Sequence, residues 1–468
     1  MKTFRFLLVG ALLLGTGRAP AGAQHRAPDF NLVRYRENYA YLAADSLFPT
    51  RTTWERLKFI PLTAQRSAYL SVGGEIRQQY ELVNNNNWGE GPEDNSGYLL
   101  QRYMLHADLH LGPHVRVFGQ LKSGLAPGKA GGPEPPDEDR LDLHQAFFDV
   151  ALPTAPDQAL TLRVGRQELA YGSSRLVSVR EGPNVRQSFD AVKAFYQLPA
   201  HQVDVFLSRP VQTNRGPFDD NADATRAFWG FYSVHRLPAL PRASLDVYYL
   251  GLRNERARFQ EGAGDERRHS VGTRLWSGGG PFAYNLEGVY QFGELGERRI
   301  RAYTASANVG YAWTGGPRWR PFVDLKAEII SGDQRAGDNH LQTFNPLFPK
   351  GAYFSQIAII GPANLVDVHP LVGVRPFPAL RVSVDADFFW RHRRADALYT
   401  APYVLARPGN ETQSRHIGYQ YTLEVEWALN DFVAFEGFLT YFAAGQFLRE
   451  SDAGRDITFF APRLTLRF

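Results

Sequence analysis

Hydrophobic and polar residues alternate with a period of two along most of this chain. Residues 98–111 show the pattern clearly. One face would carry Leu99, Tyr103, Leu105, Ala107, Leu109 and Leu111. The other would carry Arg102, His106, Asp108 and His110. Because successive side chains of a strand point to opposite sides of a sheet, this segment is expected to be a strand with one apolar face and one wet face.

The same alternation predicts eighteen strands in all. They are expected at residues 68–82, 98–111, 114–124, 140–151, 159–167, 188–197, 201–209, 225–236, 242–252, 267–277, 281–293, 298–313, 318–331, 365–375, 380–391, 413–429, 432–446 and 456–468. Short turns alternate with longer polar loops, which are expected at 83–97, 125–139, 168–187, 210–224, 253–266, 332–364, 392–412 and 447–455; only the short 294–297 breaks the rule. An even strand number with short turns on one side and long loops on the other predicts an all-β transmembrane antiparallel barrel, with turns in the periplasm and loops outside. A secreted sandwich or propeller is the alternative, but its connections need not alternate in length.

The two ends of the chain place this barrel in a bacterial outer membrane. Lys2 and Arg5 precede an apolar run at 6–14, and small residues at 21–23 offer a cleavage site, so residues 1–23 are expected to be a signal peptide. Residues 24–67 lack a strand pattern and are expected to be a periplasmic lead-in to a barrel at 68–468. The last strand ends on an aromatic residue, Phe468, which we interpret as a signal to the barrel-assembly machinery. Outer-membrane lipid is then the partner of the apolar face.

Composition narrows the class further. No apolar run of about 18 residues follows the signal, which excludes a helical membrane protein. Hydrophobic residues make up 44%, and mean hydropathy is -0.34, as expected when only every second residue faces lipid. The chain has no cysteine, and its 52 basic residues comprise only 7 Lys and therefore 45 Arg. Arginine binds carboxylates in a bidentate manner and keeps its charge when partly buried, so this bias suits a lining that faces anions.

No catalytic signature is present. The chain has neither G-x-S-x-G nor H-E-x-x-H, and its Gly-rich stretches lie in loops. Asp142 with His144, or His106 with Asp108, could belong to an acid-base set of an outer-membrane hydrolase, but residues two apart on a strand simply share its wet face. The acidic run at 218–223 lacks the spacing of a calcium loop. We therefore expect no enzyme, no cofactor, no metal site and no nucleic-acid partner.

One segment, residues 165–190, has an unusual mixture of charges and aliphatic residues. Its charged positions are Arg166, Glu168, Arg175, Arg180, Glu181, Arg186 and Asp190. Among them lie Leu176, Val177, Val179 and Val185. A freely solvated loop has little use for these aliphatic side chains, whereas a loop folded into the lumen would pack them on the wall. The charges would then form a constriction.

Several motifs in one order resemble the alginate export family. They are LKFIPL at 57–62 leading into GGEIR at 73–77, RLDLHQAF at 140–147, the 165–190 segment, SGD at 331–333, FNPLFPKG at 344–351, YF at 353–354 and GPAN at 361–364. The resemblance implies a barrel of eighteen strands that passes an acidic uronate polysaccharide outward through an arginine-rich pore. It carries pore-lining roles to Arg77, Arg102, Arg166, Glu168, Arg175, Arg180, Arg186, Asp190 and Arg391. Glu181 joins the acids that would hold these arginines apart, so that a polymer binds weakly at many sites.

Three alternatives stay open. Arg166 shares strand parity with Leu162 and Val164, so it would face lipid unless the strand bulges at Gly165. The charged residues could pair with one another simply to hold the barrel's shape, because ionisable groups inside membranes usually pair. The channel could also be a general or solute-specific porin for small molecules, which would share the same wall.

Overall fold

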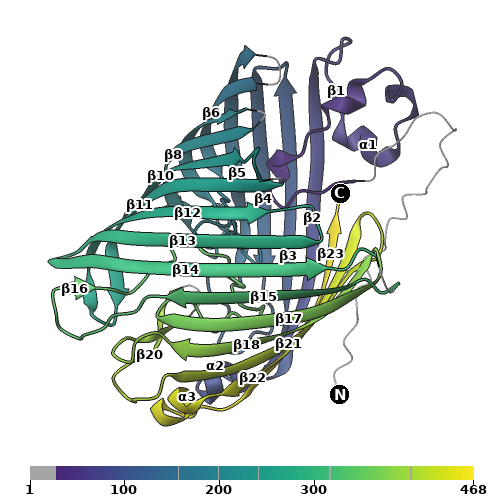
Figure 1. Cartoon of the computed structure of the whole chain (residues 1–468). Coiled ribbons are helices and arrows are strands. Elements are labelled where there is room, and N and C mark those ends of the chain that lie inside the picture. Colours follow the sequence, from purple (N-terminus) through teal and green to yellow (C-terminus); the bar gives the residue numbers. More distant parts are fainter. Residues whose placement is uncertain (1–27, 156–157, 199, 241, 316–317, 401–402) are drawn as a thin grey trace.

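The computed structural model describes residues 28–155, 158–198, 200–240, 242–315, 318–400 and 403–468. The expected signal peptide, residues 1–23, lies outside these ranges. Within them, eighteen long antiparallel strands form one closed barrel, because β2 pairs with β3 on one side and with β23 on the other (Figure 1). The strands are β2 (Ala68–Asn84), β3 (Asp94–Leu111), β4 (Val115–Leu125), β5 (Asp139–Ala155), β6 (Gln158–Gln167), β7 (Phe189–Gln197), β8 (His201–Gln212), β10 (Arg226–Arg236), β11 (Ala243–Phe259), β12 (Gly262–Ser277), β13 (Phe282–Leu295), β14 (Arg298–Ala312), β15 (Pro321–Ile330), β17 (Leu365–Phe377), β18 (Leu380–Arg391), β21 (His416–Ala428), β22 (Val433–Ala444) and β23 (Ile457–Arg467). The expected fold class and strand number are confirmed.

Alternation along each strand separates an apolar outer face from a polar inner one. On β3, Leu105 is 51% exposed on the outside, whereas its neighbours His106 and Met104 are buried inside. On β8, Leu207 is 63% exposed, and Asp204 is buried. Rows of exposed aliphatic side chains on the outside of a closed barrel are not expected to face water. They form the surface that contacts lipid.

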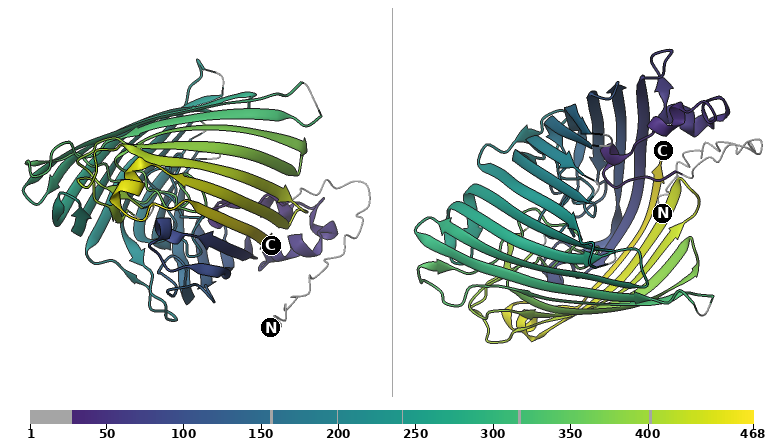
Figure 2. Two further views of the ribbon diagram at one scale, coloured as in Figure 1. Left: turned by 90° about the horizontal axis from the view of Figure 1, so that it is seen from below. Right: turned by 45° about the horizontal axis from the view of Figure 1, so that its top comes forward.

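The two barrel ends differ as the connection lengths predict. The N-terminal elements α1 and β1 lie at the end where the C-terminus lies, whereas α2, α3, β16 and β20 lie at the opposite end (Figure 1). Both views in Figure 2 place the N-terminal helices beside the C-terminal strand. The remaining elements are η1 (Arg34–Arg36), η2 (Ala40–Ala43), η3 (Phe48–Thr50), α1 (Thr53–Lys58), β1 (Ile60–Pro61), α2 (Asn86–Gly89), β9 (Asn221–Ala222), β16 (His340–Leu341), β19 (Leu398–Tyr399), β20 (Leu405–Arg407) and α3 (Gln446–Ser451). No helix in the described ranges has the length and apolar character needed to cross a membrane.

One expected loop is wrong. Residues 253–266, read as a long polar loop, instead continue β11 and β12 as a paired hairpin that turns between Phe259 and Gly262. A bulge between Asn254 and Ala257 shifts the register. The hydrophobic pattern did not predict this extension, because its residues are largely charged. Beyond the lipid, neither face of a hairpin has to be apolar.

The N-terminal segment is more ordered than its sequence suggested. Helix α1 begins with a capping box. The Thr52 hydroxyl oxygen accepts from the Glu55 main-chain N–H, and the Glu55 carboxylate accepts from the Thr52 main-chain N–H. Trp54, Phe59 and Tyr69 then pack in one apolar cluster beside the start of β2. The segment therefore docks on the barrel through its own small core.

Candidate pore constriction

The connection between β6 and β7, residues 168–188, crosses the barrel interior. At one wall, Arg77 of β2 donates to the main-chain oxygen of Glu181 at 2.8 Å. At another wall, Arg175 of the same loop lies 3.1 Å from the Glu287 carboxylate of β13. Strands β2 and β13 are not neighbours in the sheet, so this inward loop spans the lumen.

Apolar contacts and a short main-chain pairing hold the inward loop in place. Leu176 and Val177 are buried in a cluster with Phe348, which belongs to the second long loop, between β15 and β17. Ser178 donates to the Phe348 oxygen, and Phe348 donates to the Leu176 oxygen, both at 2.9 Å. The aliphatic residues that set this segment apart in the sequence thus join two loops into one inner body. This agrees with the interpretation that the segment folds inward.

Glu181 lies at the centre of an arginine cluster. It forms an ion pair with Arg102 and lies 3.3 Å from Arg186. Arg102 also binds Glu75 at 2.9 Å, and Glu75 in turn binds Arg467 of the last strand at 2.9 Å. Burial favours the neutral acid, but Arg102 and Arg186 outweigh it and hold the pKa of Glu181 below its ordinary value.

Glu168 forms a second, fully buried pairing at the root of the inward loop. Its carboxylate lies 2.9 Å from Arg186 and 2.8 Å from the Nε2 of His144. A β-bulge in β5 places His144 as an extra residue between the pairs of Gln120 and Leu121. The wet-stripe interpretation of His144 is therefore incomplete, because its ring helps to anchor the loop.

Arg175 is neutralised in the same way. Besides Glu287, it forms an ion pair with Glu328 of β15 and donates to the hydroxyl of Tyr353 at 3.1 Å. Five of the expected pore arginines and acids near the loop are thus engaged by one another. The alternative in which arginine and acid residues pair with one another to hold the barrel's shape describes these residues well.

Arg180 is the exception. It has positive φ (54°), and its guanidinium has no ion pair or side-chain hydrogen bond among the described residues. Burial and the charge of Arg226 lower its pKa to about 10, so it stays cationic at neutral pH. It faces a cavity of roughly 830 Å³ that is also lined by Arg226 and Arg256.

Arg166 and Asp190 lie in the barrel wall. They form an ion pair at 2.8 Å on paired positions of β6 and β7, and Arg166 also donates to the main-chain oxygens of Leu143 and Asp220 at 3.3 Å. The Arg166 side chain does not enter the arginine cluster, and it also lies 3.7 Å from the buried carboxylate of Asp142. It instead joins β5, β7 and the β8–β9 connection at the edge of the sheet where the chain leaves β6.

That edge needs a seal. Pairing of β5 with β6 begins only at Ala146, which leaves residues 139–145 of β5 without β6 beside them. The β8–β9 connection fills this place: Leu141 pairs in parallel with Pro217, and Phe218 donates to the Leu141 oxygen at 2.8 Å. An unpaired strand edge inside a bilayer is costly, so this patch compensates for sending the β6–β7 loop inward.

Arg391 is a loop organiser. It is fully buried at the end of β18, where its guanidinium donates to the main-chain oxygens of Arg394 (2.9 Å), Gly409 (2.7 Å) and Thr412 (3.0 Å). Its face covers the Phe447 ring of α3 at 4.0 Å. A guanidinium surrounded by carbonyl oxygens is not available to a passing anion.

Sequence reasoning missed the N-terminal segment as part of the site. Tyr35 packs edge-on against Phe118 and Phe147, which face inward from β4 and β5. Arg34 donates to the Gly74 oxygen at 3.1 Å, and Arg186 of the inward loop donates to the Leu32 oxygen at 2.9 Å. The only available signal was the mixture of charged and aromatic residues at 34–39, which lies outside every predicted strand. Residues 31–36 therefore contact inward-facing residues of the barrel and its inward loop.

Two cavities lie on either side of this inner body. The one of roughly 830 Å³ is bounded by long-loop residues, among them Arg180 and Pro183. The other, of roughly 480 Å³, is bounded by short-turn residues such as Pro113 and by Tyr35, Arg116 and Arg163. Tyr35 and the inward loop therefore stand between the two barrel ends.

Comparison with known proteins agrees with this architecture. The model of the family described as Alginate export matches residues 68–458. No curated protein sequence matches the chain. Among solved structures, a BenF-like porin from Pseudomonas fluorescens Pf-5 is 12% identical with a TM-score of 0.57, covering 85% of this chain and 99% of that one.

Two Pseudomonas aeruginosa structures are similar to the same extent. OccK11 (OpdR) is 13% identical with a TM-score of 0.54 and covers 86% of this chain and 96% of that one. OpdK, whose structure contains vanillate, is 11% identical with a TM-score of 0.56 and covers 85% and 98%. At these identities the likeness concerns the fold.

Proposed function

This chain belongs to the alginate export family and forms an outer-membrane channel, and on that premise we propose that it passes an acidic, uronate-type polysaccharide or oligosaccharide with a preference for anions. The observation that carries the proposal is the free guanidinium of Arg180, which faces the larger cavity from the loop that crosses the lumen.

The cavity contains a second cation that has no acid partner within the described part of the chain. Arg256 is exposed and lines the same space. Two acids in this wall are already paired, Asp137 with a lysine at 2.6 Å and Asp223 with an arginine at 3.5 Å. A third, Glu81, accepts hydrogen bonds from the Gln79 amide and the Tyr98 hydroxyl. Glu134 lies unpaired at the exposed rim. Among the described residues, Arg180 and Arg256 are thus the cations of this cavity that have no acid partner and can meet a carboxylate.

A carboxylated polymer loses hydration as it enters a narrow lumen, and guanidinium groups replace that water with charge-assisted hydrogen bonds. Most arginines of the cluster are compensated by Glu75, Glu168 and Glu181, which keeps the well shallow. A few free cations then attract the chain without trapping it.

Reconstituted channels test this proposal. In a planar bilayer with a KCl gradient, the wild-type protein should pass chloride in preference to potassium, and a soluble uronate oligomer should block the current. The double variant Arg180→Gln/Arg256→Gln should weaken both effects. Arg267→Gln is a matched control, because Arg267 is exposed on the outward parity of β12, and should change neither.

A small-solute porin is the second candidate, favoured by the volumes of the two cavities, which suit molecules of drug size. It predicts that a small aromatic or aliphatic carboxylate interrupts the current while uronate oligomers do not. Cation selectivity of the wild-type channel would contradict the uronate channel and favour the small-solute porin.

A further inference from the structure

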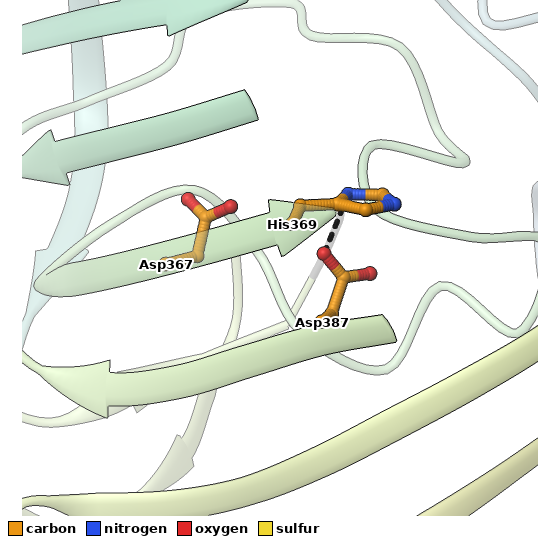
Figure 3. A group of neighbouring side chains, drawn as sticks. All are labelled: Asp367, His369 and Asp387. Atoms are coloured by element: carbon orange, nitrogen blue, oxygen red, sulfur yellow. Dashed lines mark ion pairs between the residues drawn. The ribbon is translucent and has the colours of Figure 1, made fainter. Parts of the chain in front are cut away.

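A compact group of ionisable side chains lies on the inner face of β17 and β18, away from the arginine cluster. Asp367 and His369 are two residues apart on β17 and so share a face. Asp387 of β18 stands across from His369, between the paired positions Val368 with Phe388 and Leu371 with Asp385. Figure 3 shows the three side chains rising from the same side of the two strands.

Their polar atoms converge. One carboxylate oxygen of Asp367, one of Asp387 and a ring nitrogen of His369 lie within 4.8 Å of one another. The Nδ1 of His369 is 2.5 Å from Asp387, and its Nε2 is 3.5 Å from Asp385. The imidazole is therefore held between two carboxylates, with a third beside it.

Asp367 has no partner of its own. It is fully buried, and neither of its carboxylate oxygens has a hydrogen bond or ion pair among the described residues. An ionised carboxylate is costly to bury in this way, and pairing or metal coordination is the usual remedy. The buried Asp367 carboxylate thus points toward the Asp387 carboxylate and the His369 ring.

The lysine on the neighbouring strand is already engaged elsewhere. Lys326 of β15 is paired in register with His369, but its Nζ lies 3.4 Å from Glu328 and sits over the rings of Tyr353 and Phe354 at 4.7 and 4.6 Å. It does not reach ion-pair distance of Asp367 among the described contacts. Asp367, Asp385 and Asp387 consequently share the charges of His369, Lys326 and Lys350, and none of these three cations forms an ion pair with Asp367 among the described residues.

We propose that Asp367, His369 and Asp387 bind a divalent transition-metal ion, Zn²⁺ by preference, in the wall of the lumen. One imidazole and two carboxylates are ligands that Zn²⁺ accepts, whereas Ca²⁺ and Mg²⁺ favour oxygen alone. With Nδ1 directed at the ion, Nε2 lies 3.5 Å from Asp385, so that this carboxylate is placed to orient the ring, as carboxylates orient metal-bound histidines. The ion would join β17 to β18 and neutralise the Asp367 carboxylate, which has no partner among the described residues.

The sequence predicted no metal site, because its residues are spread over two strands without a metal motif. Only the register brings them together. The proposal does not depend on which solute the channel carries.

The test uses the mature protein in detergent after dialysis against EDTA. Calorimetric titration with ZnCl₂ should show one equivalent bound, and Co²⁺ should give a visible absorption band of a low-symmetry site. Asp367→Asn and His369→Gln should abolish binding, and Asp385→Asn should weaken it about 10–100-fold. His110→Gln is the matched control: His110 also lies 3.1 Å from an aspartate, Asp108, but belongs to no group of three ligands, so binding should be unchanged.

A second measurement separates the metal site from an internal ion pair. In EDTA, Asp367→Asn should raise the midpoint of heat-induced unfolding on gels, because it removes a buried charge without a partner, and added Zn²⁺ should raise the midpoint of the wild type alone. A lower midpoint of Asp367→Asn in EDTA would mean that Asp367 is paired in the metal-free barrel. That result, or zinc binding that is absent or indifferent to Asp367→Asn, would overturn the proposal.

Discussion

The hydroxyl of Tyr35, in the N-terminal segment, donates to the main-chain oxygen of Glu168, where the inward loop leaves β6, across 2.9 Å. Two segments that are far apart in the sequence thereby meet inside the barrel. The Arg163 guanidinium covers the Tyr35 ring at 4.1 Å and fixes its position. This contact lies between the residues that line the two cavities.

Removing residues 28–37 should therefore raise single-channel conductance, because the segment narrows the lumen at the turn end. Tyr35→Ala should have a smaller effect in the same direction, and Tyr35→Phe, which keeps the ring packing, should have little. Planar bilayer recording measures each. Arg66→Gln is the control, because Arg66 belongs to the same N-terminal segment but pairs with the exposed Asp45. An unaltered conductance of the deleted, folded barrel would show that solutes take another path.

The last residue should matter for assembly. Phe468 closes the barrel by exchanging main-chain bonds with Gly74, at 2.9 and 3.1 Å. Deletion of Phe468, or Phe468→Asp, should reduce the amount in the outer membrane and leave protein in the periplasm for degradation, whereas Phe468→Tyr should assemble normally. Fractionation and immunoblotting give the amounts. Equal levels of all variants would make Phe468 a strand end and not a signal.

Glu168 should be the acid on which the inward loop most depends. Glu168→Gln would leave Arg186 and His144 buried with one anion fewer, which costs about 3–5 kcal/mol for a buried pair. The loop should then open more often and be cleaved faster by trypsin. Asp190→Asn breaks a more exposed pair with Arg166 and should cost no more than about 1 kcal/mol. Equal cleavage rates of the two variants would contradict this ranking.

Docking of the N-terminal segment should strengthen as pH rises above neutrality. Burial, with the nearby charge of Arg34, lowers the pKa of Lys58 in α1 to about 7, against an ordinary value of 10.5. Between these values the docked form has lost a proton that the undocked form keeps, so stability grows with pH across this window and is lowest below about 7. Docking can be followed by the part of the tryptophan fluorescence that a Trp54→Phe variant loses, since Trp54 packs in the cluster of this segment.

Lys58→Met should remove most of this pH dependence and stabilise docking at pH 6, since the Nζ of Lys58 is buried without a hydrogen bond. Arg56→Met, on the same helix but not buried, should keep the wild-type profile. A flat wild-type profile from pH 6 to 10 would contradict the low pKa.

The amino-acid sequence by itself determined the barrel. Alternation with a period of two assigns each side chain to lipid or to lumen, and the lengths of the connections assign the two ends, because both are local properties of a strand and its turn. This is why all eighteen strands were placed and why Val177 and Val185 marked the inward loop. The 253–266 hairpin escaped, since outside the lipid the alternation no longer has a reason to exist.

Only the tertiary structure decided what the charges do. Parity says that Arg102 and Glu75 face inward, but not that Glu181 from a loop pairs with Arg102, nor that Arg391 is enclosed by carbonyl oxygens. Whether an arginine stays free depends on which groups lie across the lumen, and that is set by barrel closure and by the paths of two long loops and the N-terminal segment. These contacts join residues that are distant in the chain, so no local pattern records them.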